Sequence, residues 1–145
     1  MTGWLRPAGH DDISALADIL RAARAELHPG QAHHAGQCAH TLRRLIGDRM
    51  GAVWVAEARG AAVGVMVAQA GAGLWCPGVQ ADCVLRWVDP AQRGHWARPM
   101  QRAFEAWARE IGADVLTVSQ TGREAEQFYR AAGYAPAERI YLKGV

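Results

Sequence analysis

The sequence lacks several features that would place it in a specialised class of protein. No stretch approaches the ~18 consecutive apolar residues that span a bilayer, and the opening M-T-G-W-L-R-P has neither the basic nor the apolar region of a signal peptide. The three cysteines, Cys38, Cys76 and Cys83, include no C-x-x-C pair, which argues against a disulfide framework. We therefore expect a cytoplasmic protein that does not contact a membrane.

A block of one charge sign is also missing. The 16 Lys and Arg residues and 14 Asp and Glu residues give a formal charge of +2, and the arginines are scattered among acids. This balance does not indicate a nucleic-acid partner, whereas an anionic small molecule would need only a local patch. No internal repeat or linker divides the 145 residues, so we expect one domain over residues 1–145.

Hydrophobic periodicity predicts both helices and strands. In chain order we expect a strand at 4–6, helices at 13–27 and 38–46, strands at 52–58, 62–69 and 81–88, a helix at 98–111, a strand at 114–119, a helix at 122–132 and a strand at 138–143. The order β-α-α-β-β-β-α-β-α-β predicts an α/β domain with a mixed sheet. Its second and third strands form a hairpin, and the strand, helix and strand over 81–119 form a right-handed parallel crossover.

The stretch V-D-P-A-Q-R-G-H-W-A-R-P-M, from Val88 to Met100, contains the main candidate for a binding site. A strand that feeds a helix through a tight turn presents the first N–H groups of that helix, which have no partners, at the positive end of its dipole. Arg93 and Arg98 add two permanent cations and His95 adds an imidazole, so a phosphate or pyrophosphate is the expected ligand. The alternative is an ordinary strand-to-helix turn with solvated arginines.

Two motifs resemble the GCN5-related N-acetyltransferase (GNAT) superfamily. Val88-Asp89-Pro90 and Arg93-Gly94 occupy the positions of V-x-P and of the leading part of Q/R-x-x-G-x-G/A, the acetyl-CoA signature of that family. The more specific match is A-x-x-F/L-Y-x-x-x-G-F/Y in the last helix, and it is met by Ala125, Phe128, Tyr129, Gly133 and Tyr134. The resemblance covers nearly the whole chain and implies a splayed, GNAT-like mixed sheet flanked by helices.

The resemblance implies that acetyl-CoA is the co-substrate. Backbone N–H groups from Gly94 to Arg98 would hold the pyrophosphate, the strand around Trp87 and Val88 would hydrogen-bond the pantetheine arm, and Phe128 would pack along it. The cofactor-binding residues implied are Trp87, Val88, Arg93, Gly94, His95, Trp96, Ala97, Arg98, Gly122, Ala125 and Phe128. Trp96 and Arg98 replace small residues of the family loop, so Trp96 either obstructs the loop, turns into the core or stacks on the adenine. Gly122 replaces the usual Asn.

The implied reaction is transfer of an acetyl group from acetyl-CoA to an amine by direct attack. Tyr129 matches the family tyrosine that returns a proton to the leaving thiolate. Asp82 is the candidate base, with Glu57 as an alternative, because we expect both on strands that face the same end of the sheet. The structural alternatives are a tyrosine packed on the sheet and two solvated acids. The acceptor, a small molecule or a peptide, is not specified by the sequence.

Two other functions are compatible with the sequence. One is a GNAT-fold binding or structural protein without catalysis, for instance from a phage-related branch. Another is a metal or sensory site in the loop that contains His28, His33, His34, Cys38 and His40. The spacing of these residues matches no standard zinc pattern, so we expect no metal and assign the loop to the acceptor pocket. A strand at 139–143 also leaves open a homodimer formed by edge pairing.

Overall fold

Five strands form one mixed sheet, and they lie in the sheet in their order along the chain. The computed structural model describes residues 3–119 and 125–145. The strands are β1 (Gly3–Pro7), β2 (Gly51–Ala58), β3 (Ala61–Ala72), β4 (Val79–Val88) and β5 (Ala113–Val118). Strands β1 to β4 pair antiparallel, and β5 pairs parallel to β4. The predicted mixed sheet, with its hairpin and its parallel crossover, is therefore confirmed.

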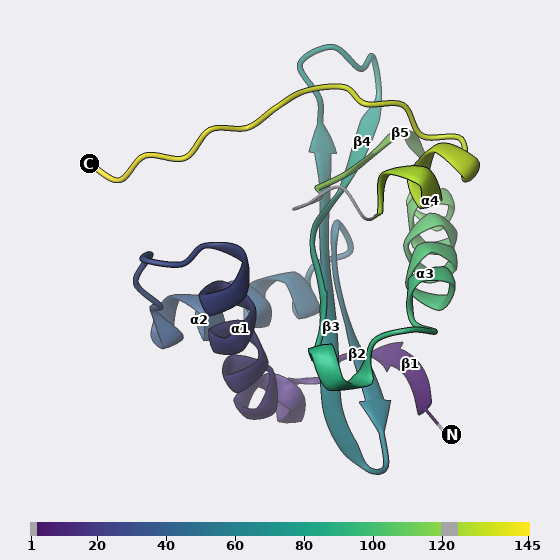
Figure 1. The fold of residues 1–145 in the computed structure, drawn as a ribbon. Helices are drawn as coiled ribbons and strands as arrows, with labels where there is room; N and C mark the ends of the chain where they lie inside the picture. The colour runs from purple at the N-terminus through teal and green to yellow at the C-terminus, as the bar shows by residue number, and fades with distance from the viewer. Residues whose placement is uncertain (1–2, 120–124) are drawn as a thin grey trace.

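Helices cover both faces of the sheet (Figure 1). One face carries α1 (Ile13–Leu27) and α2 (Ala35–Gly47), and the other carries α3 (Ala97–Glu110) and α4 (Glu126–Ala131). Short 3-10 turns at His10–Asp12 and Pro90–Gln92 precede α1 and α3. None of the helices in the described part of the chain has the length and hydropathy that a membrane crossing requires.

Each face of the sheet has its own apolar core. In α1 the buried residues are Ile13, Leu16, Ile19 and Ala23, and they pack with α2 against one face. On the other face Met100, Phe104 and Ala108 repeat every four residues along α3, as a helix needs in order to bury one stripe. These two cores hold β4 between them, so its position is fixed from both sides.

The turn between β2 and β3 explains why this hairpin was predictable. Arg59 and Gly60 have φ values of 52° and 74°, so both central residues are left-handed, as a two-residue turn with the twist of the strands requires. Glycine takes this conformation without strain, and the sequence A-R-G-A between two apolar runs therefore indicated the turn.

The predicted last strand, residues 138–143, is wrong. Residues 134–145 form no helix or strand, and Ile140, Tyr141 and Leu142 are exposed. Figure 1 shows this segment leaving α4 and running as extended chain to the C-terminus. A segment becomes a strand only when a neighbouring strand pairs with its backbone, and this segment makes no such pairing within the described residues. Its β-favouring sequence is therefore not sufficient.

The last helix is described only in part. Its predicted range was 122–132, and α4 spans Glu126–Ala131. Residues 122–124, with which the predicted helix begins, lie outside the described residues. Gly133 directly follows the predicted end of this helix at residue 132 and has a φ of 91°, the left-handed conformation that commonly ends a helix.

Candidate cofactor groove and active site

Strand β4 extends beyond the end of its parallel partner β5, so the last part of β4 has no neighbouring strand on that side within the described residues. Pairing with β5 covers Val79 to Cys83, and the N–H of Ser119 donates to the Cys83 carbonyl at 3.0 Å. At Val84 the register with β3 shifts by one residue, which is a β-bulge that re-aims the strand. From Val84 to Val88 no strand of the described residues pairs with β4 on the β5 side. The N–H and C=O groups of this stretch that point away from β3 are available to a ligand, except the Val88 carbonyl, which accepts a hydrogen bond from Arg93 at 2.9 Å.

The free edge of β4 leads directly into the predicted anion-binding turn. Asp89 accepts a hydrogen bond from the Ala91 N–H at 2.8 Å and so starts the 3-10 turn. Gly94 has a φ of 134°, a conformation that side chains rarely allow, so glycine is required there. Helix α3 then begins at Ala97, and its first N–H groups have no partners in a preceding turn. This geometry suits an anion.

Trp96 turns into the core and does not obstruct the turn. Only 4% of its surface is exposed, and its ring occupies the space beside Gly3, where an added Cβ would lie 3.0 Å from the ring. Its Nε1 donates to the Gln92 carbonyl at 3.0 Å, which fixes the ring direction. The exposed His95 ring lies over it, with ring centroids 4.8 Å apart. Of the three positions open for Trp96 from sequence, the structure has the core position.

The two predicted cations of the turn differ in their surroundings. Arg98 is exposed in the first turn of α3. Arg93 instead contacts both carboxylate oxygens of Glu26 at 2.7 Å, and its Nε donates to the Val88 carbonyl at 2.9 Å. Trp87 also donates its Nε1 to Glu26 at 2.7 Å, so its side chain points toward α1. Hydrogen bonds from Arg93 and Trp87 hold the pKa of Glu26 below its ordinary value.

Sequence reasoning missed Glu26. It lies on α1, 67 residues before Arg93, and no local pattern connects the two. Because its carboxylate neutralises much of the Arg93 charge, Arg98 and the backbone N–H groups are left as the main attraction for an anion at this turn. Val88 itself is buried on the α3 side, next to Gly64, where a Cβ would come within 2.8 Å of the Trp87 carbonyl.

The residues predicted from the last helix lie beside the free edge of β4. Ala125 is half-buried just before α4, and Phe128 and Tyr129 lie within it, with ring centroids 5.6 Å apart. Tyr129 is 7% exposed, and burial raises its pKa to about 12, so the phenol keeps its proton at neutral pH. The guanidinium of Arg86, on β4, lies 4.9 Å from the Tyr129 ring centroid. Arg86 belongs to none of the sequence motifs that predicted the site.

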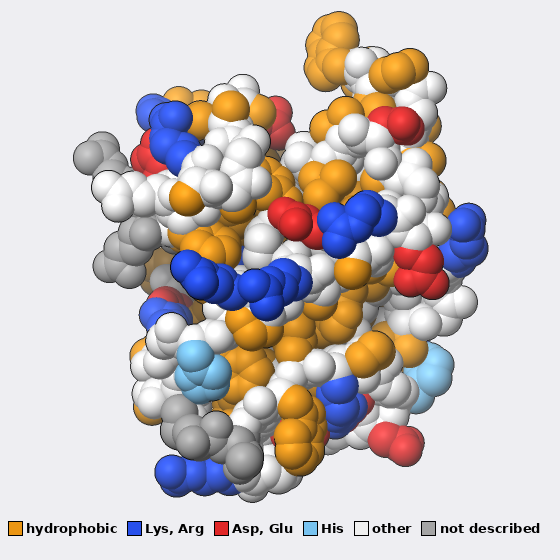
Figure 2. Space-filling model, turned by 90° about the vertical axis from the view of Figure 1, so that its right-hand side faces the viewer, with side chains coloured by type: hydrophobic (Ala, Val, Ile, Leu, Met, Phe, Trp, Pro, Cys, Tyr) orange, Lys and Arg blue, Asp and Glu red, His pale blue; other side chains and the backbone are white. Residues whose placement is uncertain are grey.

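Figure 2 shows the face of the molecule that carries these elements. Apolar side chains gather across its middle, and Lys and Arg side chains lie over them.

Of the two candidate bases, only Asp82 lies near the opening. It is half-buried on β4 and accepts hydrogen bonds from the Gln80 amide at 2.8 Å and from the Thr117 hydroxyl on β5. Strand alternation puts it on the opposite face of the sheet from its neighbour Cys83, which belongs to the α3-side core. Asp82 therefore lies where β4 and β5 are still paired, close to the point at which they separate.

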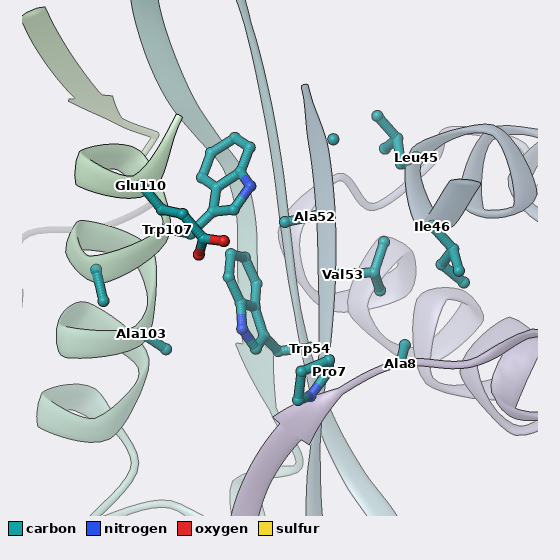
Figure 3. A pocket seen from close by; sticks show the side chains of 12 residues that line it. Pro7, Ala8, Leu45, Ile46, Ala52, Val53, Trp54, Ala103, Trp107 and Glu110 are labelled. Carbon is teal, nitrogen blue, oxygen red and sulfur yellow. The ribbon is translucent and has the colours of Figure 1, made fainter. Parts of the chain in front are cut away.

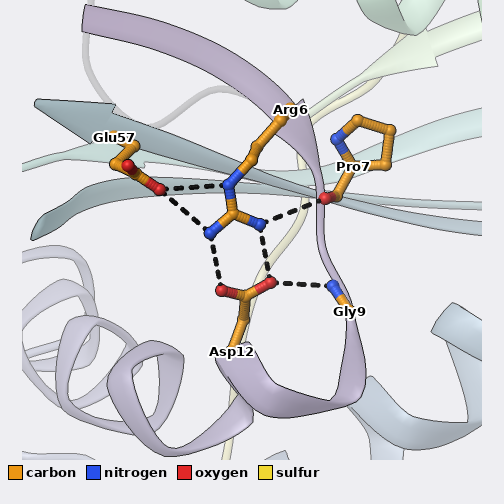
Figure 4. Close-up of polar contacts among 5 residues, drawn as sticks. All are labelled: Arg6, Pro7, Gly9, Asp12 and Glu57. Carbon is orange, nitrogen blue, oxygen red and sulfur yellow. Dashed lines mark hydrogen bonds and ion pairs between the residues drawn. The ribbon is translucent and has the colours of Figure 1, made fainter. Parts of the chain in front are cut away.

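The expectation that Glu57 faces the same end of the sheet as Asp82 is wrong. Their β3 partners are Ala62 and Gln69, seven residues apart, so the two acids are separated by about 23 Å at the rise of a strand. Glu57 accepts from Arg6 at 3.0 Å in a network with Asp12 that ties β1 to the start of α1 (Figure 4). The Arg6 hydrogen bond holds the pKa of Asp12 below its usual range. Glu57 is a structural residue of this network.

An open pocket elsewhere is lined by none of the predicted site residues. It has a volume of about 400 Å³ and lies where β2 extends past the end of β1, between α2 and the second half of α3. Figure 3 shows Trp54 and Trp107 on one side of it and Leu45 and Ile46 on the other. In residues 3–119 and 125–145, which include the histidine loop at 28–40, no three His, Cys, Asp or Glu side chains lie close enough together to share a metal ion.

The strand order, the separation of β4 from β5 and the turn into α3 together define the fold of the GCN5-related N-acetyltransferases. No family model matches the sequence, and no curated protein matches it. Solved structures do match. A predicted acetyltransferase with acetyl-CoA from Clostridium acetobutylicum is 15% identical and has a TM-score of 0.80, with 98% of this chain and 96% of that one covered. These values establish the fold.

Two further solved structures have the same fold. A GCN5-related N-acetyltransferase from Ralstonia eutropha JMP134 is 18% identical over 98% of each chain, with a TM-score of 0.75. Aminoglycoside N-acetyltransferase AAC(6')-Iy in complex with CoA is 16% identical, with a TM-score of 0.76 and coverage of 99% of this chain and 95% of that one. AAC(6')-Iy also matches in complex with a bisubstrate analogue, CoA-S-monomethyl-acetylneamine.

Proposed function

We propose that this protein is an N-acyltransferase that moves an acetyl group from acetyl-CoA to an amine. One observation carries the proposal: the unpaired edge of β4 runs without interruption into a glycine turn and the N-terminus of a 14-residue helix. A CoA thioester has a matching order of groups, with a chain of amides followed by a pyrophosphate. The solved neighbours with CoA or acetyl-CoA bound support the same co-substrate.

The residues present suit such a ligand. The N–H groups from Gly94 to Arg98, other than those used within the turn, would hold the pyrophosphate, and Arg98 would add a cation. The edge from Val84 to Val88 would pair with the pantetheine amides as an added strand, with Phe128 against the arm. Trp96 supports the turn from the core side, and Arg93 braces it through Glu26. Gly122 lies outside the described residues, so its role stays a prediction.

When bound, acetyl-CoA would supply an acetyl group activated as a thioester. Burial raises the pKa of Tyr129 to about 12 and so keeps the proton on its phenol oxygen at neutral pH, and Tyr129 would give this proton to the sulfur as the C–S bond breaks. Asp82, oriented by Thr117 and Gln80, would take the amine proton through a water molecule. Asp82 and Tyr129 lie on opposite faces of the sheet. Because Asp82 lies on the face that carries α1 and α2, the amine acceptor would approach from that side.

A small-molecule amine is the acceptor class that the neighbours favour, since one is an aminoglycoside acetyltransferase solved with a bisubstrate analogue. We place the reaction in the cytoplasm, because the three cysteines are free thiols, as a reducing compartment maintains them.

We also infer a homodimer. Three adjacent large apolar side chains near the C-terminus are exposed, namely Ile140 (74%), Tyr141 (84%) and Leu142 (61%). Such an exposed apolar patch indicates a surface that binds another protein chain. Strand β5 pairs on only one side within the described residues, so its outer edge is available to the terminal segment of a second copy. Removal of residues 138–145 should convert the dimer to a monomer in size-exclusion chromatography with light scattering. A monomeric full-length protein would contradict the inference.

Thermal unfolding with and without CoA tests the proposed activity. A ligand at a hundred times its Kd adds ~2.7 kcal/mol, which raises the Tm of a chain of 145 residues by about 9 °C. Arg98→Gln should reduce this shift, and Arg109→Gln, at the other end of α3, should leave it unchanged. Amine-dependent release of free CoA thiol from acetyl-CoA then measures turnover.

A second candidate, a GNAT-fold binding protein without catalysis, has one observation in its favour, which is the pairing of Arg93 with Glu26. It predicts no thiol release with any amine, whether or not CoA shifts the Tm. The absence of a shift at millimolar acetyl-CoA would exclude the enzyme.

A further inference from the structure

Arg86 occupies the opening between β4 and α4. It lies on the stretch of β4 that pairs with β3 and not with β5, three residues after the last pairing with β5 at Cys83. Its guanidinium carbon is 4.9 Å from the ring centroid of Tyr129 and 5.6 Å from that of Phe128. A planar cation over aromatic faces is favourably placed, and the two rings hold it on the side of the sheet that carries α3 and α4.

This cation has no counter-charge among the described residues. No Asp or Glu of residues 3–119 and 125–145 forms a salt bridge with Arg86, although five other ion pairs are present in these ranges. Its Nη1 atom is buried and has no hydrogen-bond partner among these described residues. A buried donor without an acceptor is costly, and the cost is larger for a charged group. Arg86 is therefore well suited to bind an anion that enters this opening.

The position along β4 limits which anion this is. Arg86 precedes Val88 by two residues, about 7 Å at the rise of a strand, and the turn proposed for the pyrophosphate begins only beyond Val88. The pantetheine arm that would lie along the edge carries no charge. Tyr129, the proposed proton donor to the sulfur, is the ring closest to Arg86. An anionic group bound by Arg86 would therefore be part of the acyl group of the donor. An acetyl group carries no such anionic group.

We propose that the preferred donor is a dicarboxylic acyl-CoA, such as succinyl-CoA, whose free carboxylate is bound by Arg86. This proposal rests on the proposed function. The guanidinium presents paired N–H groups that match a carboxylate, and Nη1 would gain its missing acceptor. The transfer itself is unchanged. The amine nitrogen forms the C–N bond, the C–S bond breaks, Asp82 takes the amine proton through water, and Tyr129 gives a proton to the sulfur. The carboxylate takes no part in the chemistry.

Equilibrium binding to the full chain tests this proposal with three compounds. These are succinyl-CoA, 4-methylpentanoyl-CoA, which has a similar shape without the charge, and CoA. We expect succinyl-CoA to bind about tenfold or more tightly than its uncharged analogue. Arg86→Met should remove this preference and leave the affinity for CoA unchanged, and Arg86→Lys should retain part of the preference. Arg109→Met, which removes an exposed charge from the far end of α3, should behave as the wild type.

Three results would overturn the proposal. The first is equal affinity of the wild type for the charged and uncharged acyl compounds, and the second is a preference that survives in a folded Arg86→Met variant. The third is an equal loss of affinity for all three compounds in that variant, which would mean that Arg86 contacts the pantetheine arm or the thiol that all three share. If none of the three compounds binds the wild type, the proposed function fails as well. Binding of CoA without an acyl preference refutes only the role of Arg86.

Discussion

Replacement of Trp96 by alanine tests whether the turn before α3 is anchored in the core. Trp96 is 4% exposed, packs in the cluster that contains Met100 and Phe104, and bonds to the Gln92 carbonyl. Removal of a buried tryptophan costs about 3–5 kcal/mol through lost burial and the cavity left behind. The unfolding entropy of 145 residues is about 0.3 kcal/mol per kelvin, so a loss of about 4 kcal/mol lowers the Tm by roughly 13 °C.

Thermal and urea unfolding, followed by circular dichroism, measure this loss. Trp75→Ala is the matched control, because Trp75 is 91% exposed in the loop between β3 and β4 and the same substitution there should change stability by less than about 0.5 kcal/mol. A loss below about 1 kcal/mol for Trp96→Ala would refute the buried position. If that variant also bound CoA more tightly than the wild type, Trp96 would instead fill the anion-binding turn.

Three further perturbations test the site and its supports. Gly94→Ala should destabilise the protein by about 1–3 kcal/mol, because the φ of 134° at Gly94 strains any residue with a Cβ. Gly36→Ala, at an open helical position, should be neutral or stabilising. Equal effects of the two substitutions would contradict backbone strain at position 94. The pKa of Glu26 is lowered in the folded state, so the Glu26 carboxylate stabilises the fold above pH 4.5 and this stabilisation is lost as pH falls through the folded pKa. The difference in unfolding free energy between wild type and Glu26→Gln should therefore shrink in acid. A difference that stays constant with pH would contradict the stabilising role of the Glu26 carboxylate. The pKa of Tyr129 is raised from 10.0 to about 12, so stability should fall as pH rises through that interval, less so in Tyr129→Phe. Tyr129→Phe should also lower turnover and leave the CoA-induced Tm shift intact, and an unchanged rate would remove Tyr129 from its role.

The candidate site was only partly predictable, because its elements meet through space. Gly94, Arg98 and Tyr129 were found from local motifs, since a tight turn, a helix start and a helix pattern all leave marks in neighbouring residues. Glu26 and Arg86 left no such marks. Glu26 meets Arg93 only after α1 packs on the sheet, and Arg86 reaches Tyr129 only because β4 and α4 come together. The misplacement of Glu57 has the same origin, since strand position in a sheet depends on register.

The sequence alone determined the class of fold and the order of its elements as far as the last helix. Periodicity, glycine turns and helix starts act over a few residues, and they predicted the mixed sheet, the hairpin through Arg59 and Gly60 and the stop of α4 at Gly133. Tertiary structure decided what depends on distant partners. It turned Trp96 into the core, paired Arg93 with Glu26 and left residues 138–143 without a neighbouring strand. A propensity is a property of a segment, whereas burial, ion pairing and strand formation each need a second segment in place.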